Sequence, residues 1–134
     1  MLAYTYISHG KFELIDKPKP ELQGPRDASV RITLGSICTS DLHIKHGSVP
    51  RAVPGITVGH EMVGVVEEVG AEVRSVKTGG VDGCDCAEIL SLIEAGKIDT
   101  TPLITHRYKL ADIAEAYHLF ENKLDGVIKV AVEP

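Results

Sequence analysis

Two short clusters of the sequence hold residue types that could bind a metal ion. The first has five polar or ionisable side chains within six positions, namely Cys38, Thr39, Ser40, Asp41 and His43. The second is the pair His60-Glu61, which begins 22 positions after Cys38. Thiolate, imidazole and carboxylate are the ligand types that zinc accepts in proteins. Pro50, Pro54 and Gly55 predict a loop between the clusters, and such a loop could fold both onto one ion.

Each of these residues also has an ordinary structural interpretation. A single cysteine such as Cys38 is more often a small buried apolar side chain than a ligand. Thr39 or Ser40 could simply cap a helix, and His43 could be a surface residue. The metal hypothesis therefore depends on the combination of the two clusters rather than on any one residue.

Alternating apolar residues predict the strands that position the first cluster. Leu2 to Ser8 and Lys11 to Asp16 are expected to form a β-hairpin. Ala28 to Cys38 alternates in the same way, so Cys38 is expected where a strand ends. Thr39 to His46 is compatible with a short helix, capped by its first or second residue, and such a helix places Ser40 and His43 on one face.

The second cluster opens another predicted strand, from Glu61 to Val69, in which Gly64 marks a bulge or a close approach of two backbones. A glycine-rich connector follows at 78–86. Beyond it we expect a helix to about Ala95, an irregular or extended stretch, a helix over 111–122 and a final strand over 127–132. The apolar stripe of the helix over 111–122 is interpreted as core and consists of Ile113, Ala116, Tyr117 and Phe120.

Composition limits the possible classes of function. The chain has 134 residues, enough for one domain with a buried core, and is 43% hydrophobic and 25% charged. Its formal charge is −5 and its basic residues are scattered, which argues against a nucleic-acid partner. The apolar runs are much shorter than the about 20 residues of a membrane span. Three cysteines, an odd number, and no leader pattern predict a reducing, cytoplasmic location.

The two clusters resemble motifs of the zinc-dependent medium-chain alcohol dehydrogenases. The run Cys38-Thr39-Ser40-Asp41-Leu42-His43 resembles the first zinc-ligand motif of that family. Gly59-His60-Glu61, followed by Gly64 and Glu67-Glu68-Val69-Gly70, resembles the second. The tail from Glu88 through Val132 is similar to the segment that returns to the catalytic domain after the family's cofactor domain.

The resemblance implies a fold and a domain organisation. The fold would be mainly β with peripheral helices (α+β), a GroES-like partly open β-barrel. One domain over 1–134 would consist of 1–77 and 87–134, joined by the glycine-rich connector 78–86.

The resemblance also implies a role for each site residue. Cys38 and His60 would be zinc ligands, and Glu61 a ligand or a carboxylate close to the ion. Asp41 would orient a ligand without touching the metal. Ser40 would take the proton of a substrate alcohol and His43 would pass it toward solvent.

The implied reaction is the zinc-assisted oxidation of a primary or secondary alcohol or a polyol, or reduction of the aldehyde or ketone, with NAD or NADP. The sequence has no GxGxxG fingerprint for a dinucleotide. It therefore looks like a shortened family member with no cofactor domain, in which we expect activity to be weak or lost unless a nicotinamide is supplied from outside.

Three alternatives stay open at this point. The chain could be a catalytically inactive scaffold or assembly module with a vestigial zinc site, or, more remotely, a zinc-storing or co-chaperonin-like oligomer. The resemblance also implies a further zinc ligand, an Asp or Cys, that has no counterpart in this sequence, and Cys84-Asp85-Cys86 could replace it or could be a remnant of joining two segments. A surface that faced a cofactor domain should be apolar, so we also predict a homo-oligomer.

Overall fold

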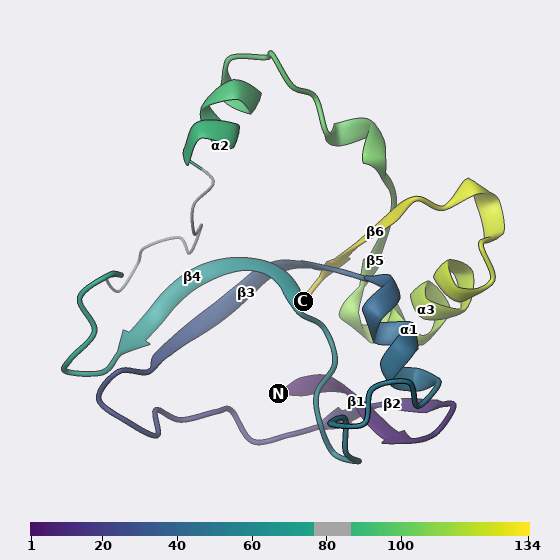
Figure 1. The fold of residues 1–134 in the computed structure, drawn as a ribbon, viewed down its shortest axis with the longest axis horizontal. Coiled ribbons are helices and arrows are strands. Elements are labelled where there is room, and N and C mark those ends of the chain that lie inside the picture. The colour runs from purple at the N-terminus through teal and green to yellow at the C-terminus, as the bar shows by residue number, and fades with distance from the viewer. Residues whose placement is uncertain (77–86) are drawn as a thin grey trace.

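The structure is a computed structural model that describes residues 1–76 and 87–134. In this part of the chain the strands form two sheets with few helices around them (Figure 1). The smaller sheet is the antiparallel hairpin of β1 (Leu2–Ser8) and β2 (Lys11–Asp16), with the predicted bounds. The larger sheet has the order β4-β3-β6-β5. Its strands are β3 (Ala28–Ser36), β4 (Glu61–Val69), β5 (Ile104–Lys109) and β6 (Lys129–Glu133).

β3 is the strand that organises the larger sheet. It pairs antiparallel with β4 along its whole length and with β6 at its last two residues. In this register Ser36 lies opposite Glu61 on β4 and opposite Ala131 on β6. The end of β3 is therefore flanked by the beginning of β4 and by the last strand of the chain.

At Gly64 the backbone of β4 lies very close to β3. A Cβ atom at position 64 would collide with the backbone carbonyl of Arg31 and would lie 2.7 Å from a methyl group of Val30. The strand register shifts next to it, between Ile32 and Leu34. The predicted close approach at Gly64 is confirmed, and its cause is the absence of a side chain.

Three α-helices are present in the described residues, and their positions agree with the predicted ones to within a few residues. They are α1 (Thr39–Lys45), α2 (Ala87–Glu94) and α3 (Ile113–Glu121). Short 3-10 turns are η1 (Thr101–Leu103), η2 (Leu110–Asp112) and η3 (Leu124–Gly126). None of the described helices is long and apolar enough to cross a membrane.

The predicted N-cap of α1 is wrong. Cys38, not Thr39 or Ser40, occupies the N-cap position, in an extended backbone conformation. The carboxylate of Asp41 accepts a hydrogen bond from the Cys38 backbone N–H at 3.1 Å. The third residue of the helix thus reaches back to its N-cap, as in a capping box, and this arrangement leaves the Ser40 hydroxyl for other contacts.

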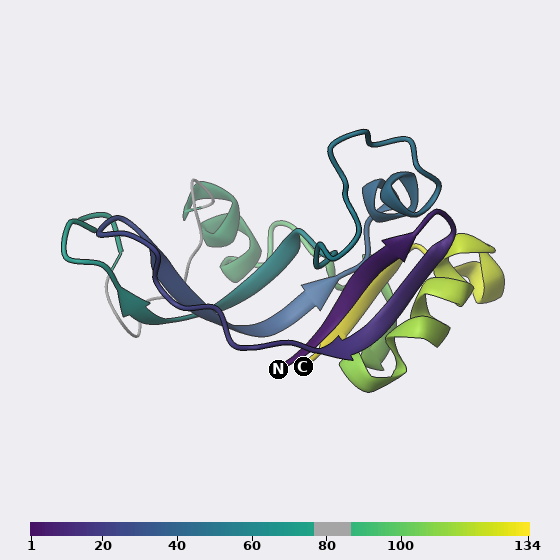
Figure 2. The same cartoon turned by 90° about the horizontal axis from the view of Figure 1, so that it is seen from below.

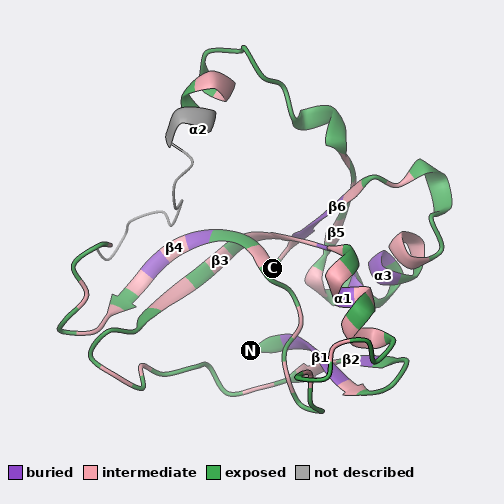
Figure 3. Ribbon diagram, viewed as in Figure 1, coloured by how far each residue is buried: buried purple, intermediate pink, exposed green. Residues whose placement is uncertain are grey.

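The buried core joins the hairpin to α3 and β6, which lie next to it in Figure 2. The rings of Tyr4 and Tyr117 have centroids 5.0 Å apart, and Phe12 lies edge-on to both, at 5.4 and 5.6 Å. We call Tyr4, Tyr6, Phe12 and Tyr117 the aromatic core. Buried positions are concentrated in this half of the molecule (Figure 3), and the predicted apolar stripe of α3 is part of it.

Candidate metal centre

The two predicted clusters meet at one end of the β3–β4 pair. Cys38 follows β3 by two residues, and His60 directly precedes β4. Because Ser36 and Glu61 are register partners, the antiparallel pairing closes the gap of 22 positions between the clusters. The loop with its prolines only has to return the chain to the same end of the sheet.

Three side chains form a group able to hold a metal ion. Ligand atoms of Cys38, His60 and Glu61 all lie within 4.8 Å of one another. A thiolate, an imidazole and a carboxylate form a donor set that suits zinc. The residues present therefore fit the ion that the sequence predicts, by donor chemistry and by proximity.

Asp41 fixes the orientation of His60 from inside the protein. Its side chain is fully buried, at 0% exposed, and one carboxylate oxygen lies 3.2 Å from Nδ1 of His60. The other oxygen accepts the Cys38 backbone N–H. A carboxylate on one ring nitrogen makes that nitrogen the donor and leaves Nε2 for a metal.

The Ser40 hydroxyl lies among the ligand atoms. Its Oγ is 3.1 Å from Sγ of Cys38 and 3.0 Å from Nε2 of His60. A hydroxyl in this place can exchange a proton with a group bound at the same site. The geometry is compatible with the predicted role of Ser40.

His43 is not brought into this cluster. It is exposed on α1, and its ring makes no hydrogen bond with any described residue. The relay from Ser40 to His43 therefore has no direct contact between the two side chains, and it stays a prediction. His60 itself is also partly exposed, with 49% of its side chain accessible, so the site opens to solvent.

The ionisable ligands have shifted pKa values. Hydrogen bonds from Ser40 lower the pKa of the Cys38 thiol, which favours thiolate. A hydrogen bond with Cys38, aided by the negative charge of Asp41, raises the pKa of His60. Burial raises the pKa of Glu61, but hydrogen bonds from Lys129 and Ser36 outweigh it and lower the pKa overall. Metal ligands bind in their deprotonated forms, so an anionic Cys38 and Glu61 suit a cation.

Sequence reasoning missed three residues that touch this site. Ser36 and Lys129 both donate hydrogen bonds to the same carboxylate oxygen of Glu61. Burial raises the pKa of Tyr117 far above its usual range, and the charge of Asp41 and a hydrogen bond to it add to the shift. The only sequence signal for Lys129 is a lone charge at the start of an apolar strand, and Tyr117 gave no signal beyond its place in the stripe.

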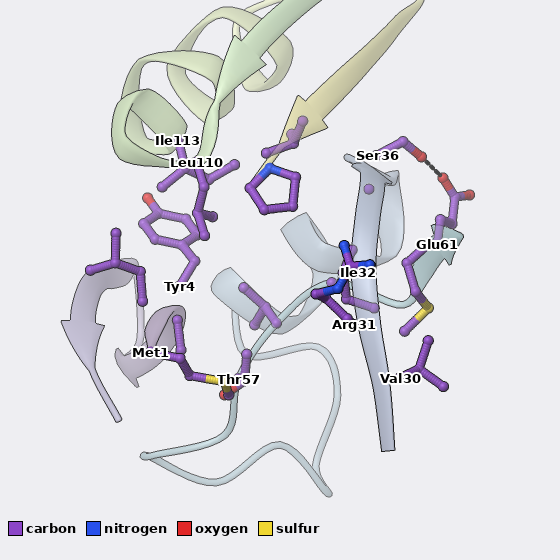
Figure 4. A pocket seen from close by; sticks show the side chains of 18 of the residues that line it. Met1, Tyr4, Val30, Arg31, Ile32, Ser36, Thr57, Glu61, Leu110 and Ile113 are labelled. Carbon is purple, nitrogen blue, oxygen red and sulfur yellow. Dashed lines mark hydrogen bonds between the residues drawn. The ribbon is translucent and has the colours of Figure 1, made fainter. Parts of the chain in front are cut away.

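A cavity of about 690 Å³ opens beside the candidate metal centre (Figure 4). Ser36 and Glu61 lie at one end of it, and the hydrogen bond between them is drawn in the figure. Most of the lining is apolar and includes Met1, Tyr4, Val30, Ile32, Leu110 and Ile113. A smaller cavity of about 360 Å³ is lined by Lys129 and again by Glu61. Glu61 therefore borders both spaces.

Comparison with known proteins gives the family. A profile of the alcohol dehydrogenase GroES-like domain matches residues 24–90, half of the chain, and this range contains every candidate ligand. The chain belongs to this family. The predicted resemblance is thereby confirmed for the N-terminal part, whereas the resemblance of the tail from Glu88 through Val132 stays a prediction.

Relatives and solved structures agree with this assignment. An alcohol dehydrogenase of Cupriavidus necator is 47% identical over 79 residues, which are 59% of this chain and 21% of that protein. The alcohol dehydrogenase TADH from Thermus sp. ATN1 is 40% identical, with a TM-score of 0.55, over 60% of this chain and 23% of that one. The apo form of zinc dependent alcohol dehydrogenase 2 from Streptococcus pneumonia is 43% identical, with a TM-score of 0.57, over the same shares.

These matches confirm the predicted fold class, α+β with a GroES-like arrangement. The match spans only about a fifth of the length of the curated relative. The chain therefore belongs to a family of zinc-type oxidoreductases. The family match alone does not specify the reaction of this chain. The possible replacement ligands Cys84, Asp85 and Cys86 lie outside the described residues.

Proposed function

We propose that this chain is the alcohol-activating part of a zinc-dependent, NAD(P)-linked alcohol dehydrogenase. Cys38 and His60 hold the zinc ion, with Glu61 as a third ligand or a carboxylate beside it. The observation that carries the proposal is the convergence of these three side chains within 4.8 Å from two separate segments. The family membership of residues 24–90 adds to it.

The residues divide the work between orientation and proton transfer. When bound, zinc supplies Lewis acidity that lowers the pKa of an alcohol hydroxyl. Asp41 keeps the Nε2 of His60 available by hydrogen bonding to Nδ1. Ser40 would accept the proton of the alcohol while giving up its own hydroxyl proton, and His43, exposed on the same helix but not in contact with Ser40, would be the group that passes a proton on to solvent.

Oxidation of the alcohol also needs a hydride acceptor, which is NAD or NADP in this proposal. In this proposal the nicotinamide is supplied from outside the described residues. The substrate class is a primary or secondary alcohol or a polyol, with the aldehyde or ketone in the reverse direction.

The same proposal includes a domain and an assembly. Residues 1–77 and 87–134 form one domain, and the pairing of β6 with β3 and the shared core support this. The apolar residues Met62, Val63 and Leu103 are about half exposed around the smaller cavity, which supports a homo-oligomer. A reducing cytoplasm suits a site that needs the Cys38 thiolate.

Zinc content and cofactor reduction test the proposal. The purified chain, after gel filtration with zinc, should retain about one zinc per chain, and a Cys38→Ala variant should lose most of it. His118→Ala, which changes an exposed histidine far along the sequence on α3, is the matched control and should retain zinc. Equal zinc content in wild type and Cys38→Ala would refute the site.

The hydride step has its own readout. Wild type with zinc, an alcohol and NAD or NADP should produce reduced cofactor, measured by absorbance, above the level of a His60→Ala variant. Zinc binding without any turnover above that variant would favour the alternative of a catalytically inactive scaffold with a vestigial site. The same samples in analytical ultracentrifugation would show a monomer if the assembly part is wrong.

A further inference from the structure

The cavity of about 690 Å³ lies between the two sheets rather than within one of them. Its walls come from β1, β3, β4 and α3, and no described strand of the smaller sheet pairs with a strand of the larger one. Pockets for small molecules typically measure about 300–1,000 Å³ and are mostly apolar, with a few polar groups that fix the orientation of the ligand. The cavity has this size and this kind of lining.

Apolar side chains form the long walls of the cavity. Val30 and Ile32 of β3 line one wall, and Tyr4 and Ile113 lie across from them in Figure 4. Such walls can bury an aliphatic chain, because each methylene group removed from water contributes favourably. They offer few partners for the many hydroxyl groups of a sugar or a polyol, which would lose hydrogen bonds to water there.

The cavity extends along β4 between two polar ends. At one end the Ser36 hydroxyl hydrogen-bonds to the Glu61 carboxylate, as drawn in Figure 4. Glu67 lines the cavity six positions further along the same strand, which corresponds to up to about 20 Å at about 3.3 Å per residue. The space between the two ends is therefore long enough for an extended ligand.

The Glu67 end carries an excess of positive charge. Nζ of Lys19 lies 2.7 Å from Oε2 of Glu67, and Nε of Arg31 lies 3.1 Å from Oε1. One carboxylate thus faces two cations, all three of which line the cavity. The two terminal nitrogens of the Arg31 guanidinium make no hydrogen bond with any residue that the structure describes. A guanidinium group with unused donors can bind both oxygens of a carboxylate.

We propose that the cavity binds a long-chain aliphatic carboxylate, with its head group at Arg31 and Lys19 and its chain between the two sheets. Charge complementarity gives the head group and its direction, because the excess positive charge lies at the Glu67 end and the anionic Glu61 lies at the other. The side chains of Arg31 and Lys19 are 57% and 68% exposed, so the head group keeps contact with water and its charge is not buried. This site needs neither zinc nor a nicotinamide.

A second cluster in the chain has the same charges but no cavity. Arg107 and Lys109 both pair with Glu133, and their side chains are 59% and 66% exposed. None of these three residues lines either of the two cavities described above. Because two such clusters occur in one chain, the ion pairs alone do not define a site. The apolar cavity beside the Glu67 cluster is what distinguishes it.

Calorimetric titration of the full chain with dodecanoate, below its micelle concentration and without added metal, tests the site. We expect saturable binding of about one dodecanoate per chain, and weaker binding of octanoate, whose shorter chain buries less apolar surface. Ile32→Trp places a larger side chain in the cavity and should weaken dodecanoate binding about tenfold or more. Leu34→Trp, on the same strand but in the lining of the smaller cavity, is the matched control and should bind as wild type does.

A double variant, Lys19→Gln with Arg31→Gln, tests the head group. It should lower the affinity for dodecanoate about fivefold to twentyfold, the effect of two partly exposed charge contacts. Dodecanol, which has the same chain and no charge, should bind more weakly than dodecanoate to wild type and equally to both proteins. Arg107→Gln with Lys109→Gln is the matched control, because it makes the same change around Glu133. All four substituted side chains are exposed, so both double variants should fold.

Three results would overturn the inference. The first is the absence of saturable dodecanoate binding to wild type, and the second is unchanged binding to an Ile32→Trp variant whose circular dichroism shows that it is folded. The third is a dodecanoate affinity that does not fall in the double variant at Lys19 and Arg31, or that falls no more than the affinity for dodecanol. Cys38→Ala should bind dodecanoate as wild type does, so failure of this site and failure of the proposed zinc site can be told apart.

Discussion

The aromatic core and the β3–β4 ribbon, meaning residues 28–36 and 61–69, are built in different ways. In the core, Phe12 and Tyr117 are at most 9% exposed and contact each other ring to ring. In the ribbon, Met62 and Val63 are 52% and 47% exposed, although they belong to a nine-residue strand. The core is therefore held by apolar burial, and the ribbon around Met62 and Val63 is held mainly by the pairing of two backbones.

The candidate metal centre lies where these two regions meet, and its parts reflect the side they come from. Asp41, on the core side, is fully buried and fixes His60. Glu61, at the start of the ribbon, is held by a partly exposed ion pair. In the proposed site, Cys38 and His60 are therefore the rigid ligand candidates and Glu61 is the adjustable one.

The largest expected effect on the free energy of unfolding comes from removing one aromatic ring from the core. Phe12→Ala should lower the free energy of unfolding by about 3–5 kcal/mol, because it leaves a cavity against Tyr4 and Tyr117. Met62→Ala in the ribbon removes a side chain that is already half exposed, and it should change stability by only about 0.5 kcal/mol. Urea denaturation followed by circular dichroism measures both. Similar losses in the two variants would contradict the contrast between core and ribbon.

The ribbon should instead be sensitive to the distance between its backbones. Gly64→Ala places a methyl group against the Arg31 carbonyl, and we expect a loss of about 1–3 kcal/mol in the free energy of unfolding. Gly24→Ala is the control, since its Cβ would meet only a carboxylate oxygen of Asp27 at 3.8 Å. The same denaturation assay applies. Equal stability of the two variants would mean that the strands adjust freely.

The rigid side of the metal centre can be tested through Asp41. Asp41→Asn removes the charge behind His60, and we expect cobalt or zinc affinity to fall about 10–100-fold. The control is Asp125→Asn, which alters an exposed carboxylate paired with His106 away from the site. Competitive metal titration measures both variants. If Asp41→Asn binds metal as tightly as wild type, the buried carboxylate does not support the ligand.

Local patterns in the sequence predicted most of the elements. β1, β2 and β4 begin and end where alternation and turn residues indicated, and turn-forming glycines lie next to them, Gly10 between β1 and β2 and Gly70 after β4. The final strand was predicted over 127–132 but is Lys129–Glu133. The turn at Asp125-Gly126 was predicted, but the strand begins later because the backbone N–H groups of Val127 and Ile128 bond to the Leu124 carbonyl and the Thr105 hydroxyl rather than to a neighbouring strand.

The metal site was predictable only in part. The types and spacing of Cys38, Asp41, His60 and Glu61 singled them out, and the structure places them close together, whereas their roles stay a prediction. The contact of Lys129 with Glu61 spans 68 positions and depends on the register of β6 against β3. No turn joins β3 to β6, so turn geometry, which sets the register of a hairpin, gives no signal of this pairing in the sequence.

The smallest expected effect concerns the outer edge of the core, where α1 and α3 are joined by charges. Glu121 on α3 contacts Lys45 and also pairs with His46 at 2.7 Å. The hydrogen bond from Lys45 is the main cause of a lowered pKa for Glu121. A carboxyl group with a lower pKa in the folded state than its unfolded value of about 4.3 stabilises the fold above that pH. This contribution is lost as the pH falls through the folded pKa.

Glu121→Gln should therefore lower stability by at most about 1 kcal/mol at pH 7, the size of a partly exposed ion pair. The difference from wild type should shrink below about pH 4, because wild type then loses the same charge. Thermal or urea unfolding at several pH values measures it, with Glu115→Gln, an exposed residue of the same helix, as the control. A pH-independent difference would show that Glu121 acts by packing rather than by charge. The core would then be held by apolar contacts up to its edge, and the contrast with the ribbon would be sharper.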